Sequence, residues 1–95
     1  EEGFSIVRTD TSGVFFGMVE KREGKEVTLT DARRLWYWEG ASSLSELAMK
    51  GTSKPGGCKF PCAVNRVTLT EVIEIIDCTQ IAVDSINAVP EWTAH

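Results

Sequence analysis

The sequence predicts one α+β domain over residues 1–95, with an antiparallel, strongly bent sheet or small partly open barrel and elements in the order β-β-β-β-α-β-β-α. Short alternating segments separated by turn residues fill the first third of the chain, and two amphipathic helical stretches follow later. A chain of 95 residues suits a single domain, and 42% hydrophobic with 25% charged residues is typical of a globular protein.

Three short strands are expected first. Apolar and polar residues alternate in each, and the turn clusters at residues 10–13 and 22–25 predict a meander with short hairpins. We expect Gly17 to mark a bulge or a close approach of two backbones. The expected strands are Phe4–Arg8, Val14–Glu20 and Glu26–Thr30.

A fourth strand is predicted over Arg33–Trp38, because aromatic residues favour strands. Alternation would give this strand two different faces. One face would carry Arg33, Leu35 and Tyr37, and the other Arg34, Trp36 and Trp38.

Two helices are predicted by their caps and apolar stripes. Ser43 and Glu46 have the spacing of a capping box at the start of a helix over residues 41–50, and Thr79 can cap a helix over residues 80–88. Residues 52–61 are expected to form a loop rich in Gly and Pro. Residues 64–77 are strongly β, with a change of phase near Thr70 and Glu71, so two strands or one bulged strand are expected.

The charges are distributed unevenly. The net charge is −4, yet residues 47–70 contain no acidic residue and four basic ones, whereas residues 67–95 contain no Lys or Arg. This pattern argues against binding of duplex nucleic acid, which needs a broad basic face. It leaves room for one compact anionic ligand. The acidic residues of the last quarter are expected to form a solvated face rather than a catalytic or metal site.

Recognisable catalytic and metal motifs are absent from the sequence. The three cysteines have a C-x3-C spacing followed by a distant third, which fits no zinc site, and the single histidine is His95. No nucleophile–base pair is evident, so we expect a protein without enzymatic activity, metal or cofactor. Neither a signal peptide nor an apolar run long enough for a bilayer is present, so no membrane partner is expected, and the cytosol or a particle assembled there is the expected location.

The candidate binding residues fall in two stretches. Indole rings beside guanidinium groups could hold a flat anionic molecule, because rings stack on bases and Arg pairs with phosphate. Alternatively, one aromatic face of the expected fourth strand packs in the core and the other forms a subunit interface. The ligand site and the interface are compatible if a ligand binds between subunits. The loop at residues 54–59 could close over an anion or could simply connect helix and sheet. The candidate residues are Arg33, Arg34, Trp36, Trp38, Lys54 and Lys59.

A family resemblance covers nearly the whole chain. The stretch Ala32–Ala41 (ARRLWYWEGA), the following Ser43–Ala48 (SLSELA), Gly51–Pro55 (GTSKP) and Cys58–Phe60 (CKF) resemble a family of small uncharacterised proteins of tailed phages and prophages. The family has no assigned activity, so the resemblance implies an origin and a context rather than a reaction.

In that context, we expect an oligomeric, non-catalytic protein that sequesters a nucleotide-like host immune signal in the cytoplasm of the infected bacterium. One alternative is a structural or decoration protein of the virion. A second is an inhibitor of a host enzyme whose acidic tail mimics nucleic acid.

Overall fold

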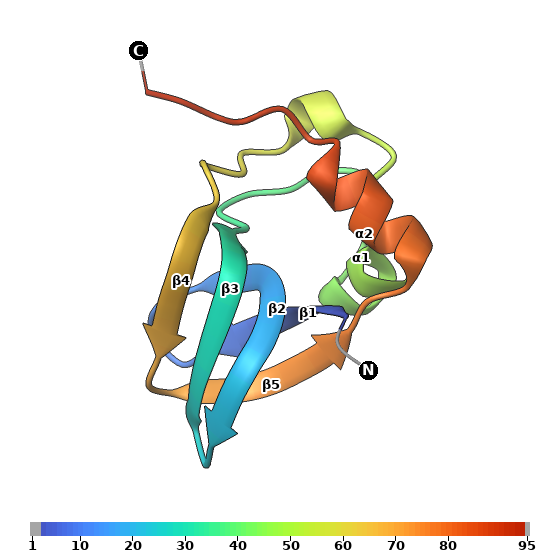
Figure 1. The fold of residues 1–95 in the computed structure, drawn as a ribbon. Coiled ribbons are helices and arrows are strands. Elements are labelled where there is room, and N and C mark those ends of the chain that lie inside the picture. Colours follow the sequence, from blue (N-terminus) through green and yellow to red (C-terminus); the bar gives the residue numbers. More distant parts are fainter. Residues whose placement is uncertain (1–2, 95) are drawn as a thin grey trace.

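The structure, a computed structural model, describes residues 3–94 and confirms the α+β class. Five antiparallel strands form one open sheet in the order β4-β3-β2-β1-β5, and two helices lie beside it (Figure 1). The strands are β1 (Phe4–Thr9), β2 (Val14–Glu23), β3 (Glu26–Arg34), β4 (Val64–Leu69) and β5 (Val72–Asp77). The helices are α1 (Leu44–Lys50) and α2 (Gln80–Asn87), and a 3-10 turn, η1, spans Pro55–Gly57.

The sheet is strongly bent, as its connections require. β4 and β5 form the two edges of the sheet, yet only Thr70 and Glu71 separate them in the chain. The two edges must therefore meet at this end, and the backbone amide of Val72 donates to the carbonyl of Lys25 at the tip of the β2–β3 hairpin. The opposite end of the sheet stays open, with β4 and β5 diverging (Figure 1).

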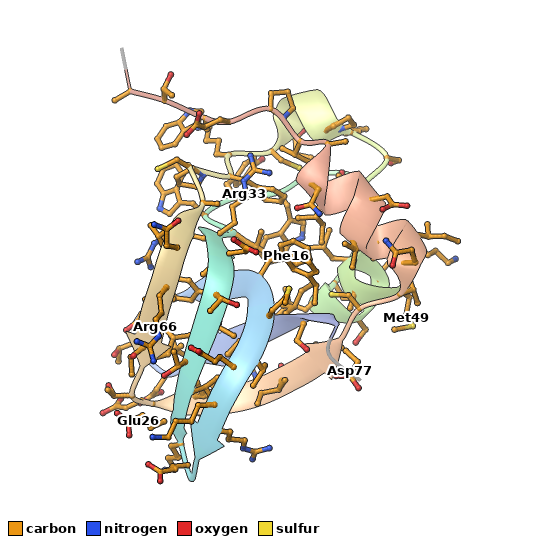
Figure 2. The ribbon with its side chains drawn as sticks, in the orientation of Figure 1. Phe16, Glu26, Arg33, Met49, Arg66 and Asp77 are labelled. Carbon is orange, nitrogen blue, oxygen red and sulfur yellow. The ribbon has the colours of Figure 1, made fainter. Side chains whose placement is uncertain are left out.

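Two hydrophobic clusters lie on the two faces of the sheet. The first fills the space between the sheet and the helices, where Ile6 and Phe16 pack against residues of α1 and α2 (Figure 2). The second lies inside the bend and includes Val7 and Phe15. Neighbouring residues of β1 and β2 pack into opposite clusters, so these central strands are apolar on both faces. This explains why their sequences contain adjacent apolar residues.

Both helices begin at the predicted caps. The hydroxyl of Ser43 accepts from the amide of Glu46 at 3.2 Å, and the hydroxyl of Thr79 accepts from Ala82 at 3.1 Å. The carboxylate of Glu46 accepts from the amide of Ser42, which completes the reciprocal pair of the capping box one residue before the cap itself. Neither helix reaches the length and apolar character that a bilayer crossing requires, and the same holds for every helical segment within residues 3–94.

Two sequence predictions concern β3 and its neighbour. Gly17 does mark a bulge: the β2–β3 register shifts there, and a Cβ at this position would lie 3.1 Å from the backbone of Ala32. The prediction of a separate fourth strand over Arg33–Trp38 was wrong. Arg33 and Arg34 end β3, and the following residues leave the sheet, forming only an isolated bridge between Tyr37 and Lys59.

Leaving the sheet removes the strict alternation of faces. Leu35 is buried in the first cluster and Trp38 packs against the same cluster, whereas Trp36 and Tyr37 between them are both exposed. The tryptophans at 36 and 38 therefore do not share a face.

Candidate functional site

An aromatic–lysine cluster, consisting of Trp36, Tyr37, Lys59 and Trp92, is exposed on the surface. The rings of Trp36 and Trp92 are stacked, with centroids 5.1 Å apart and planes at 16°. The Lys59 ammonium lies 5.4 Å from the Trp36 ring, 5.6 Å from the Tyr37 ring and 5.8 Å from the Trp92 ring. Trp36, Tyr37 and Trp92 are 57%, 44% and 40% exposed as whole residues, so all three lie at the surface.

Three chain segments bring these residues together. The amide of Lys59 donates to the carbonyl of Tyr37 at 2.7 Å, which places the segment after η1 antiparallel to the segment after β3. The amide of Trp92 donates to the carbonyl of Phe60 at 3.0 Å, and Phe60 forms a parallel bridge with Glu91. The chain after α2 thus returns along residues 59–60 (Figure 1), and Trp92 reaches Trp36 by this route.

The ammonium group of Lys59 contacts the aromatic rings and forms no ion pair with an acidic residue among residues 3–94. Neither of the two ion pairs among residues 3–94 includes Lys59. A nearby carboxylate, Glu39, accepts instead from the hydroxyl of Tyr37 at 2.9 Å. That hydrogen bond, together with the negative charge of Glu39, raises the pKa of Tyr37.

The loop that carries Lys59 is packed around Cys58. This buried thiol lies 3.6 Å from the carbonyls of Glu39 and Lys54. Gly40 has φ of 84°, and a Cβ there would lie 2.6 Å from the amide of Lys54, so only glycine allows the two loop strands to approach this closely. These contacts fix the backbone of the loop next to Lys59.

Arg33 has a structural environment. Its side chain is 8% exposed and lies where β3, α2 and residues 60–61 meet (Figure 2). It donates four hydrogen bonds of 2.8–3.0 Å to the backbone carbonyls of Phe60, Pro61, Ile86 and Val89. Burial lowers the pKa of Arg33, and the charge of Glu91 opposes that shift; an arginine remains protonated at neutral pH in any case.

The other candidates from the sequence lie apart from one another. Arg34 is exposed and stacks on the ring of Phe15 at 4.3 Å, at the mouth of the second cluster. Trp38 is half-buried against the first cluster. Lys54 is exposed at the start of η1, and none of the cation–ring contacts formed within residues 3–94 involves it. Of the six candidates, the structure brings together only Trp36 and Lys59.

Two members of the cluster, Tyr37 and Trp92, were not predicted from the sequence as site residues. Tyr37 was expected on the face opposite Trp36, an expectation that depended on the wrong fourth strand. Trp92 lies 56 positions after Trp36 in the chain, and its only local signal is that a large aromatic residue stands two positions after Pro90, beyond the last helix. The backbone pairing that returns the tail to Phe60 is a tertiary feature with no sequence motif.

The arrangement is suited to binding a planar, negatively charged group. Exposed ring faces stack on planar groups, and an adjacent ammonium attracts negative charge. The fold and this surface together define a small antiparallel α+β domain with an exposed aromatic–lysine surface.

The chain belongs to the family described as Domain of unknown function (DUF6948), whose profile matches residues 4–86. The match ends before Trp92, so the family region contains three of the four cluster residues. Comparisons with curated proteins and with solved structures gave no match.

Proposed function

We propose that this protein is a non-catalytic binding protein whose aromatic–lysine cluster binds a planar, anionic ligand of the nucleotide class. The observation that carries the proposal is the gathering of three exposed rings around one ammonium group that no acid among residues 3–94 pairs with. A base would stack on the exposed face of Trp36 or Trp92, and its phosphate would lie against Lys59. Base–aromatic stacking contributes about 1–3 kcal/mol per base.

The openness of the cluster supports an oligomeric binding mode. A small ligand in a protein site usually has about 70–90% of its surface buried. A flat, exposed surface on one subunit cannot enclose a ligand to that extent, whereas two such surfaces facing one another can. We therefore extend the proposal to an oligomer that holds the ligand between the clusters of two copies.

The biological setting comes from the resemblance to proteins of tailed phages and prophages. In that setting, the proposed ligand is a nucleotide-derived immune signal of the bacterial host, and the protein acts by sequestering it in the infected cell. The same surface also supports a second candidate, a structural protein of the virion, because exposed Trp and Tyr are typical anchors of protein interfaces.

A binding panel tests the ligand class. Wild-type protein is titrated by calorimetry with cyclic dinucleotides, cyclic trinucleotides and ADP-ribose derivatives, and in parallel with Trp36→Ala and Lys59→Gln variants. We expect at least one compound to bind, with affinity lowered about tenfold or more by Trp36→Ala. Lys59→Gln should weaken binding and reduce its dependence on salt.

The matched control is Lys25→Gln, which removes one positive charge from the distant β2–β3 hairpin. It should bind like the wild type. If no compound in the panel binds, or if the Trp36 and Lys59 variants bind as well as the control, the proposed function is wrong. Mass spectrometry of purified phage particles decides the second candidate, since a virion protein would be present there in stoichiometric amounts.

A further inference from the structure

A cavity of about 250 Å³ lies at the open end of the bent sheet and shares no lining residue with the aromatic–lysine cluster. Its walls come from β2, β3, β4 and the segment before β4. Phe15 and Ala32 belong to the second hydrophobic cluster, and Val67 packs against it, so the cavity continues the interior of the bend. The lining residues are Phe15, Ala32, Arg34, Pro61, Cys62, Val64 and Val67.

Among residues 3–94, Arg34 is the one cation that lines this apolar cavity. Its guanidinium carbon lies 4.3 Å from the centroid of the Phe15 ring, and Nη1 donates to the carbonyl of Ser12 at 2.6 Å. Neither ion pair within residues 3–94 includes Arg34. A guanidinium has five N–H groups in a planar fork, so most of its donors remain for a carboxylate, which accepts two of them at once.

We propose that this cavity binds a small amphipathic carboxylate, with its apolar part among the valines and Phe15 and its carboxylate on Arg34. The volume sets the size of the ligand. An apolar cavity of about 150 Å³ holds benzene, which has six carbon atoms, so a cavity of about 250 Å³ corresponds to roughly nine or ten non-hydrogen atoms. Benzoate, with nine, has the right size and charge.

The apolar walls and the single cation predict a specific selectivity. A neutral molecule of the same shape would fill the same volume but would leave Arg34 without a charged partner. Because charge-assisted, bidentate hydrogen bonds are about twice as strong as neutral ones, a carboxylate should bind more tightly than its amide. This site is independent of the proposed function, since none of its lining residues belongs to the aromatic–lysine cluster.

The test is an NMR titration of ¹⁵N-labelled protein with benzoate and, separately, with benzamide. We expect benzoate to shift the amide signals of Phe15, Ala32 and Val67, with a dissociation constant of about 1 mM or lower, as is usual for so small a ligand. Benzamide should bind roughly tenfold more weakly. Arg34→Gln should remove the preference for benzoate, and Val67→Phe, which fills the cavity, should abolish the shifts for both compounds.

Arg22→Gln is the matched control, because Arg22 is an exposed arginine on the far hairpin whose side chain bonds only a backbone carbonyl within its own turn. It should keep the preference for benzoate. The proposal is overturned if benzoate at about 20 mM shifts none of the three amides, if the shifts are confined to Trp36 and Trp92, or if Arg34→Gln keeps the full preference.

Discussion

Replacing Arg33 with Met should destabilise the protein strongly, although the sequence predicts a binding role for Arg33 and Arg34 alike. Its guanidinium joins three segments that are remote in sequence: the end of β3, residues 60–61 and the end of α2. Methionine preserves much of the apolar volume but donates no hydrogen bond. The variant therefore removes the four bonds and the buried charge together, while most of the apolar volume stays.

The magnitude follows from the fate of the four carbonyls. Within residues 3–94, the carbonyls of Pro61 and Val89 accept hydrogen bonds from Arg33 alone, whereas those of Phe60 and Ile86 also accept backbone amides. Each buried carbonyl that loses its only donor costs about 1–3 kcal/mol. Removing the buried charge, and water entering from the adjoining 460 Å³ cleft, offset part of this loss. We expect a net loss of about 3 kcal/mol.

Urea denaturation measures the effect. With a urea m-value of about 1 kcal/mol per molar for a chain of this size, the unfolding midpoint should fall by about 3 M. Arg34→Met is the matched control, since it removes the neighbouring but exposed guanidinium, and it should lower the stability by less than about 1 kcal/mol. Equal, small losses for the two variants would refute the structural role assigned to Arg33.

Three further predictions concern the rings of Trp36 and Trp38, the thiol of Cys78 and the helix cap at Gly51. Trp38→Ala should lower the free energy of unfolding by about 3 kcal/mol, whereas Trp36→Ala should lower it by less than about 1 kcal/mol, because only the Trp38 ring packs against the core. Urea denaturation of the two variants measures the difference. Desolvation by burial raises the pKa of Cys78 from 9.0 to about 11, so its thiolate fraction at pH 8 falls about 100-fold. Because the thiolate is the reactive form, iodoacetamide should modify the exposed Cys62 before Cys78, and peptide mass spectrometry can follow the order of modification. This raised pKa favours the protonated thiol in the folded state, so its contribution to stability is present below pH 9 and is lost between pH 9 and 11. Gly51→Ala should lower the melting temperature, because Gly51 has φ of 76° and an added Cβ would collide with a side chain of α2.

Local signals in the sequence were sufficient for most of the fold. Ser43 and Thr79 cap the two helices because the hydroxyl–amide contacts that define a cap lie within three residues. The phase change at Thr70 and Glu71 marks the point where the chain passes from one edge of the sheet to the other. Each of these features depends on neighbours in sequence, which is why composition and spacing could predict them.

The fourth strand failed for a tertiary reason. Aromatic β-propensity reports how well a side chain fits a pleated, partly buried surface, and it does not specify a partner strand. After Arg34, the chain forms one isolated bridge, between Tyr37 and Lys59, instead of extending the sheet. Alternation then no longer applies, and Trp36 and Trp38 point to different environments.

The candidate site could be predicted only in part, for the same reason. Adjacent arginines look equivalent in sequence, yet Arg33 meets the carbonyls at the end of α2, and Arg34 faces the mouth of the second cluster. Trp92 enters the cluster only because the tail pairs with Phe60. A stretch rich in Trp and Arg thus contains two of the three exposed rings of the cluster, and the remote partners determine which of its residues lie at the surface.

The three tryptophans offer the most direct test of the aromatic–lysine cluster as a binding surface. Each indole N–H gives its own NMR signal, and the signals can be assigned by replacing each ring in turn. When the tightest-binding nucleotide of the panel is added to ¹⁵N-labelled protein, the Trp36 and Trp92 signals should shift and broaden, while the Trp38 signal stays in place. A saturating ligand that moves only Trp38, or none of the three, would contradict the account.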